Sequence, residues 1–208
     1  MHLAVSDLSF EYPTPTLLAR TQPLLHQISF QLEKSEILHI QGPNGCGKTT
    51  LLKLLAGLFR PVSGQMTCAG KDIWSDIITY QHNLCYLGHK NGINPSLTVW
   101  EHCQLDWHAD VPTQSIEQAL QALTLWSVKD RPCYLLSAGQ KRRVALLRLL
   151  LSPAQLWLLD EPLVALDTDG MAWLLSCLQD HIAQGGQVVY SSHQALPWQA
   201  AGHQVYVL

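Results

Sequence analysis

The sequence lacks any hydrophobic run long enough to cross a lipid bilayer. The most apolar helical candidate, residues 144–151, contains Arg148 and is far shorter than the roughly 20 apolar residues that a membrane-spanning helix needs. A secretory leader is also missing from the opening residues, Met1-His2-Leu3-Ala4. We therefore expect a cytosolic chain that reaches a membrane only through a partner.

An excess of charge of either sign is missing as well. The 208 residues include 13 Lys and Arg and 16 Asp and Glu, which gives a net charge of -3. A nucleic-acid-binding face would need a basic patch. The one basic cluster, Lys141, Arg142 and Arg143, fits on a single helical turn, where a solvated face or a local contact is the commoner explanation. We expect no nucleic-acid partner.

Paired cysteines are also absent, since the six cysteines are spaced singly, without C-x-x-C or a zinc-like cluster. We expect them to be reduced thiols. The ten histidines are dispersed too, and only His89 and His193 are candidates for a site. The cysteines are Cys46, Cys68, Cys85, Cys103, Cys133 and Cys177.

One segment has the pattern of a phosphate-binding loop. It fits G-x-x-x-x-G-K-[ST] and follows a short apolar strand at residues 37–41. Its glycines let backbone N–H groups approach an anion, and the positive end of the next helix adds to the attraction. Lys48 is expected to contact the β- and γ-phosphates, and the Thr49 hydroxyl to bind Mg²⁺. A chance glycine-rich turn is the alternative. The segment reads Gly42-Pro43-Asn44-Gly45-Cys46-Gly47-Lys48-Thr49-Thr50.

A buried strand followed by two acids lies further along the chain. Residues 156–159 are all apolar, as in a parallel sheet covered on both faces, and Asp160 and Glu161 follow directly. Asp160 is expected to hold Mg²⁺ through water, and Glu161 to orient or deprotonate the attacking water. An acid pair that only starts a helix is the alternative, and Pro162 is compatible with it.

Between the glycine loop and the acid pair lies Leu136-Ser137-Ala138-Gly139-Gln140. Ser137 and Gly139 fall where a loop turns into a helix, which is a natural anion site. Ser137 acting as an N-cap and nothing more is the alternative. Taken alone, these five residues are weak evidence for a nucleotide-binding segment. Their position between the other two motifs favours contact with a nucleotide.

Two rings complete the candidate site. His193 follows the strand expected at residues 188–191 and is placed to reach a γ-phosphate. Tyr12 is a candidate to stack on adenine, with an ordinary core aromatic as the alternative.

The alternation of strand and helix patterns predicts a single α/β domain over residues 1–208. We expect an α/β nucleotide-binding core with an antiparallel part from residues 1–88 and 152–208, and a helical subdomain from residues 89–151. A turn is expected at residues 13–15, and broken loop and strand at 61–70. Expected strands are 3–12, 25–33, 37–41, 156–159, 188–191 and 204–208, and expected helices are 49–58, 98–107, 113–125, 138–151 and 168–184.

With its motifs in this order, the sequence resembles the nucleotide-binding subunits of ABC transporters over nearly its whole length. The resemblance implies an α/β P-loop NTPase fold with a RecA-like core sheet, an antiparallel β edge and an inserted helical subdomain. It implies ATP and Mg²⁺ as cofactors. It also makes residues 42–50 the Walker A motif, 136–140 the signature and 165–167 the D-loop, with Asp160 as the Walker B aspartate.

The same resemblance assigns the catalytic roles. Glu161 would be the catalytic glutamate, His193 the switch histidine, and Lys48 the cation on the phosphates. It further implies a head-to-tail homodimer in the ATP-bound state, in which Ser137 and Gly139 of one copy face the ATP on the other.

One departure narrows the resemblance. His89 takes the place of a glutamine that usually contacts magnesium in this family, and it lies in a Gly-His-x-x-Gly-Ile loop. Together with LSAGQ-x-RRVAL, that loop is similar to the ATPase subunits of cytochrome c maturation, the A subunits of the haem exporter. This resemblance implies an integral membrane permease and further haem-handling proteins as partners, at the cytoplasmic face of a bacterial inner membrane.

Other classes are weighed against this one. A soluble ABC ATPase of DNA repair or translation should carry a coiled-coil arm, a second cassette or a basic face. A small GTPase needs an Asn-Lys-x-Asp guanine reader, which is missing. A non-catalytic nucleotide sensor is disfavoured by the presence of both Glu161 and His193. The ATPase of an unrelated small ABC exporter stays open.

Overall fold

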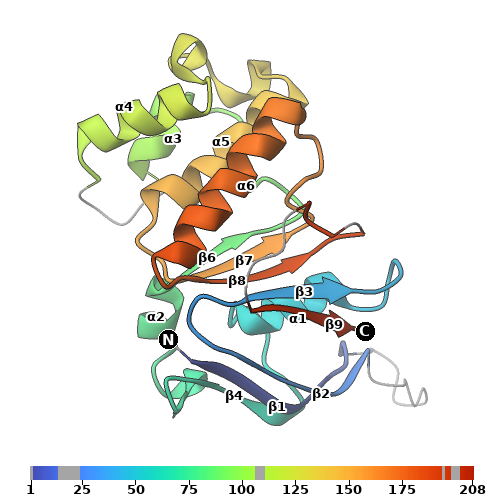
Figure 1. Cartoon of the computed structure of the whole chain (residues 1–208). Helices are drawn as coiled ribbons and strands as arrows, with labels where there is room; N and C mark the ends of the chain where they lie inside the picture. Colours follow the sequence, from blue (N-terminus) through green and yellow to red (C-terminus); the bar gives the residue numbers. More distant parts are fainter. Residues whose placement is uncertain (1, 14–23, 106–110, 194, 198–201) are drawn as a thin grey trace.

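Two β-sheets lie on either side of one helix and organise the chain (Figure 1). The computed structural model describes residues 2–13, 24–105, 111–193, 195–197 and 202–208. Within these ranges, no helix is both long and apolar enough to cross a membrane.

The larger sheet is parallel throughout and carries the candidate site along one edge. Its five strands stand in the order β6-β7-β8-β3-β9, and every neighbouring pair is parallel. The carboxyl ends of β3, β7 and β8 therefore meet at the same edge, where ligands of α/β sheets bind. The strands are β3 Ile37–Gln41, β6 Leu84–Leu87, β7 Leu156–Asp160, β8 Gln187–Ser191 and β9 His203–Val207.

The antiparallel strands form a second sheet of their own, in the order β2-β1-β4-β5. Strand β1 lies at its centre and pairs antiparallel with both β2 and β4. The strands are β1 Leu3–Phe10, β2 Leu25–Leu32, β4 Ser63–Cys68 and β5 Lys71–Asp72.

Helix α1 (Lys48–Leu55) fills the space between the two sheets. Its four leucines, at positions 51, 52, 54 and 55, are fully buried. They share one apolar core with Leu3 and Val5 of β1 and with Leu158 of β7. Because α1 begins directly after the glycine loop, this packing fixes the direction in which the loop leaves the sheet.

The other face of the parallel sheet is covered by helices and holds a second apolar core (Figure 1). Strand β7 shows how both faces are used, because Leu156 and Leu158 face the first core while Trp157 and Leu159 face the second. This alternation explains why its residues are apolar without interruption. Helices α5 (Ala138–Leu151) and α6 (Thr168–Ala183) lie against the sheet, and α4 (Thr113–Ala122) packs on α5. Helix α3 (Val99–Leu105) contributes to the same core.

Most expected elements occur, with shifted ends. Helix α5 has the expected bounds of 138–151. The helix expected over 113–125 ends at Ala122, because Thr124 adopts a left-handed φ of 55°. The turn expected at 13–15 and the helix expected at 98–107 both extend beyond the described residues.

Several short elements were not predicted. They are β5, β6, the helix α2 (Ile77–His82) and the 3-10 turns Ile73–Ser75, Trp126–Val128 and Cys133–Leu135. Each is too short to give a clear periodic pattern in the sequence.

Candidate functional site

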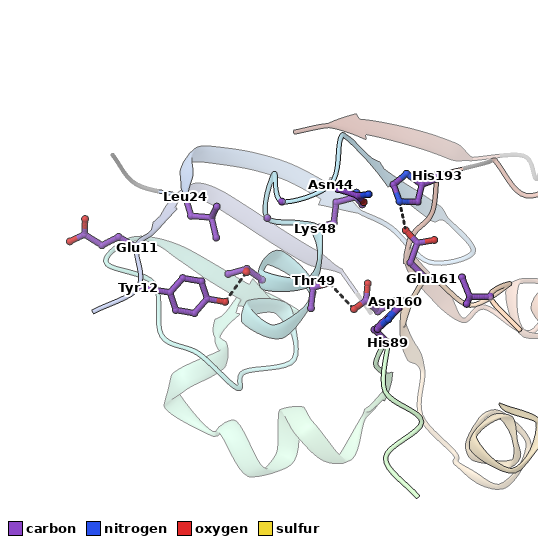
Figure 2. A pocket seen from close by; sticks show the side chains of 14 residues that line it. Glu11, Tyr12, Leu24, Asn44, Lys48, Thr49, His89, Asp160, Glu161 and His193 are labelled. Carbon is purple, nitrogen blue, oxygen red and sulfur yellow. Dashed lines mark hydrogen bonds and ion pairs between the residues drawn. The ribbon is translucent and has the colours of Figure 1, made fainter. Parts of the chain in front are cut away.

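A cavity of about 880 Å³ lies at the carboxyl edge of the parallel sheet (Figure 2). It brings together the glycine loop, the acid pair, Tyr12, His89 and His193, which are separated widely along the chain. Its lining residues are Glu11, Tyr12, Leu24, Asn44, Gly45, Gly47, Lys48, Thr49, Thr50, His89, Asp160, Glu161, Val164 and His193.

The glycine loop owes its shape to backbone angles that favour glycine. Gly45 has φ of 83°, and a Cβ built there would meet no heavy atom within 4 Å, so it would stand in open space. Gly47 has φ of 107°, and a Cβ there would come 2.7 Å from Cδ2 of Leu25. The loop can therefore curl tightly while its outer side stays clear for a ligand. Gly42, Pro43 and Cys46 belong to the same loop but do not line the cavity.

Lys48 is folded back over this loop. Its Nζ donates hydrogen bonds to the carbonyl oxygens of Gly42, at 2.8 Å, and Pro43, at 3.0 Å. The side chain is buried, yet it lines the cavity. The ammonium group is thus held at the position where the loop would curl around an anion.

Asp160 joins the glycine loop to the parallel sheet. Its Oδ2 accepts a hydrogen bond of 2.8 Å from the Thr49 hydroxyl, and its Oδ1 accepts one of 2.7 Å from the Ser191 hydroxyl. Only 1% of Asp160 is exposed. Mg²⁺ binds oxygen ligands, often one or two carboxylates together with phosphates and water, and a hydroxyl beside a carboxylate fits that preference. Burial, reinforced by the charge of Asp160, raises the pKa of the nearby Tyr86 to about 12.

Glu161 and His193 lie next to one another on the same side of the cavity (Figure 2). Nε2 of His193 lies 3.6 Å from Oε1 of Glu161. The backbone of Glu161 has a left-handed φ of 48°, and its N–H donates to the carbonyl oxygen of Ser191 at 3.1 Å. This turn directs the carboxylate into the cavity, where it can accept a proton from a water molecule.

Tyr12 and His89 lie at opposite sides of the cavity (Figure 2). The hydroxyl of Tyr12 shares a hydrogen bond of 2.9 Å with the hydroxyl of Thr50. Its ring packs edge-on against Phe10, with 5.1 Å between the ring centroids, and the residue is 47% exposed, so part of Tyr12 stays accessible to a ligand. Histidine 89 follows β6 and lies beside Asp160 in Figure 2.

The signature segment lies outside this cavity. Ser137 caps helix α5, since its hydroxyl accepts from the backbone N–H of Gln140 at 3.2 Å. The Gln140 side chain accepts in return from the backbone N–H of Ser137 at 3.0 Å. Both Ser137 and Gly139 are accessible to solvent, but none of the three lines the cavity of its own chain.

Two residues that contact the site were not singled out from the sequence. Ser191 anchors Asp160, and it looked like an ordinary strand residue. Arg142 is only 3% exposed and donates a hydrogen bond to the carbonyl oxygen of Glu161. Its spacing held a signal, because residues 142, 145 and 149 follow one another on the buried side of α5. Of the two explanations for this basic cluster, the local contact applies to Arg142 and the solvated face does not.

Comparison with known proteins decides the family. The ABC transporter family profile matches residues 25–164. A cytochrome c biogenesis ATP-binding export protein, CcmA, from Legionella pneumophila (strain Lens) is 47% identical over 206 residues, which cover 99% of this chain and 100% of the relative. The chain belongs to the CcmA family of ABC transporter ATP-binding proteins.

A second CcmA relative and a solved structure agree. A CcmA protein from Yersinia pestis is 45% identical over 184 residues, which cover 88% of this chain and 84% of the relative. A putative ABC transporter ATP-binding protein from Pyrococcus furiosus has a TM-score of 0.82 at 26% identity, covering 100% of this chain and 98% of that one. The ABC-type fold, the ATPase activity and the CcmA resemblance expected from the motifs are confirmed.

Proposed function

We propose that this chain is the ATP-hydrolysing subunit of an exporter that powers a membrane partner in c-type cytochrome biogenesis, through haem export or release of a haem chaperone. The observation that carries the proposal is the meeting of Lys48, Thr49, Asp160 and Glu161 in one cavity. The names of its CcmA relatives support the choice of pathway.

Within the cavity, the residues divide the chemistry of ATP hydrolysis. The N–H groups of the glycine loop and Lys48 stabilise the negative charge that develops on the phosphates. Thr49 and Asp160 would hold Mg²⁺, which supplies positive charge to the phosphate oxygens when bound. Glu161 accepts a proton from the water that attacks the γ-phosphorus, and His193 orients that water. The bond from this phosphorus to the bridging oxygen breaks, and ADP and inorganic phosphate leave.

A second copy of the chain would complete the site. Ser137, Gly139 and Gln140 lie at the accessible start of α5, away from the cavity of their own chain. In a head-to-tail homodimer this helix start would face the phosphates held by the partner copy, as helix N-termini do with anions. ATP would then hold the two copies together, and hydrolysis would release them.

The remaining assignments are proposals of the same kind. Tyr12 stacks on adenine, and His89 approaches the γ-phosphate or Mg²⁺ from the Asp160 side. Residues 1–88 and 152–208 form the nucleotide-binding core, and residues 89–151 form a signature subdomain. The chain works at the cytoplasmic face of an inner membrane, where it docks on an integral permease and acts with other haem-handling proteins.

The test is complementation of a bacterium that lacks its own CcmA. We expect the wild-type chain to restore haem-stained c-type cytochromes, and the Lys48→Ala variant to restore none. A purified chain that hydrolyses ATP but restores no cytochrome would instead favour the ATPase of an unrelated small exporter. A chain without ATPase activity would contradict the proposal altogether.

A further inference from the structure

Arg142 is a buried cation that contacts two separate parts of the cavity wall. One amino group of its guanidinium donates to the carbonyl oxygen of Glu161 at 2.9 Å. The other donates to the carbonyl oxygen of Gly88, at 3.3 Å, and to Oδ1 of Asn91, at 3.2 Å. A single side chain of α5 therefore joins segments that lie 19 and 54 residues away from it.

The two segments carry side chains that face the same cavity. Gly88 and Asn91 stand on either side of His89 in the sequence, so the guanidinium holds the loop that carries this histidine. At Glu161, the backbone N–H is held by Ser191 and the carbonyl oxygen by Arg142. A left-handed φ is costly for a residue other than glycine and persists only where its surroundings fix it. Arg142 supplies one of the contacts that fix it.

Stability alone does not explain a charge at this position. Burial lowers the pKa of Arg142, and the neighbouring charge of Asp160 acts in the opposite direction. Within the described part of the chain, no carboxylate forms an ion pair with Arg142, and its Nε has no hydrogen-bond partner. A buried charge that no carboxylate contacts directly is costly. The five donors of a guanidinium, fixed in one plane, can however join several acceptors at once.

We propose that Arg142 is a positioning residue for ATP hydrolysis, which holds the Glu161 carboxylate and the His89 loop in one arrangement. This inference rests on the proposed ATPase function. Arg142 does not line the cavity, so it acts through the main chain of Glu161 and through the His89 loop and touches no phosphate. Its loss should slow the chemical step more than it weakens ATP binding.

The test compares Arg142→Gln and Arg142→Lys with the wild-type chain and with Lys141→Gln as a matched control on the same turn. We expect Arg142→Gln to lower kcat about 10- to 100-fold, because small misplacements of catalytic groups have effects of that size. ATP affinity, measured by calorimetry, should change less than about 3-fold, since the phosphate-binding loop is untouched. The kcat of Arg142→Lys should lie between those of the wild type and Arg142→Gln, because one ammonium group cannot join both segments.

Asn91 offers a second route that leaves Arg142 in place. Asn91→Ala removes one acceptor and should lower kcat, whereas Asn91→Asp keeps an acceptor oxygen and should retain the wild-type kcat. In the double variant, Asn91→Ala should add less than about a 2-fold loss to Arg142→Gln, because residues that act through one contact are not additive.

The outcomes separate this inference from the proposed function. If the wild-type chain does not hydrolyse ATP, the proposed function fails. If it does, and Arg142→Gln keeps a wild-type kcat or lowers kcat only in step with a fall in Tm, the positioning role is wrong. Should Arg142→Gln not fold, equal rates in Asn91→Ala and the wild type would overturn the inference by themselves.

Discussion

The hydroxyl of Thr49 donates a hydrogen bond of 2.8 Å to the carboxylate of Asp160, although 111 residues separate the two in sequence. Thr49 stands in the first turn of α1, and Asp160 is the last residue of β7. Ser191, at the end of the neighbouring β8, holds the other oxygen of the same carboxylate. The two candidate ligands of a magnesium ion are thus side by side before any ion binds.

Asp160→Asn should raise the Mg²⁺ concentration needed for half-maximal ATPase activity by about 10-fold or more, since an amide oxygen is a poorer ligand than a carboxylate. An Mg²⁺ titration of the ATPase rate measures this change. Asp169→Asn, exposed on α6, is the control and should match the wild type. A wild-type titration curve for Asp160→Asn would remove Asp160 from the metal site.

Lys48→Ala should lower the ATPase rate by about 100-fold or more, because a cation aimed at developing phosphate charge is lost. The rate of phosphate release from purified protein checks this. Lys53→Ala is a matched control on the same helix, since Lys53 lies over the ring of Phe59 and does not line the cavity. An unaltered rate in Lys48→Ala would overturn the phosphate-loop assignment.

Glu161→Gln should lower kcat by about 100-fold or more, as expected for loss of a general base, while ATP binding persists. Because ATP is then bound but not consumed, the proposed homodimer should accumulate. Size-exclusion chromatography with and without ATP measures it. Glu117→Gln on α4 should behave as the wild type, and normal turnover in Glu161→Gln would exclude Glu161 as the base.

Two variants of Ser137 separate capping from contact with ATP. Ser137→Ala removes the cap of α5 and should reduce the free energy of unfolding by about 1 kcal/mol. Ser137→Asp keeps a good cap but sets a negative charge against the phosphates of a second copy. Its Tm should stay close to that of the wild type while its ATPase activity falls sharply. Full activity in Ser137→Asp would limit Ser137 to its capping role.

The free energy of unfolding should fall as the pH drops below about 6.5, partly because of His39. Burial lowers the pKa of His39 beneath its usual 6.5, so the unfolded chain takes up a proton there that the folded chain resists. Within this window one such group contributes at most about 1.4 kcal/mol per pH unit. Burial also lowers the pKa values of His181 and His203, which adds to the slope.

His39→Gln tests this contribution, since an amide can still donate to the carbonyl oxygen of Ser192, the 3.0 Å partner of His39. Urea unfolding at several pH values between 5.5 and 8 should give a shallower slope than in the wild type. An identical slope in His39→Gln would show that His39 does not contribute.

The parts of the fold that local signals determine could be predicted from the sequence. Helix α5 begins at its expected residue because Ser137 and Gln140 form a capping box, which is visible as a sequence pattern. Strand β6, in contrast, is a run of only four residues and exists through its pairing with β7. No pattern within residues 84–87 could report a partner 72 positions further on.

The same limit applies to the candidate site. The glycine loop and the acid pair were found because each motif carries its chemistry in adjacent residues. Arg142 was not, because its contacts with Gly88, Asn91 and Glu161 form only in the folded chain. The capping hydrogen bonds of Ser137 do not decide between its two roles, because the same hydroxyl can serve in either.

Helix α1, held between two sheets, has a consequence for how a nucleotide arrives. The leucines of α1 are fully buried in the apolar core between the sheets, so the helix cannot tilt or unwind without disrupting that core. The start of α1, where the phosphates would bind, is therefore preorganised. Little binding free energy is lost in ordering it.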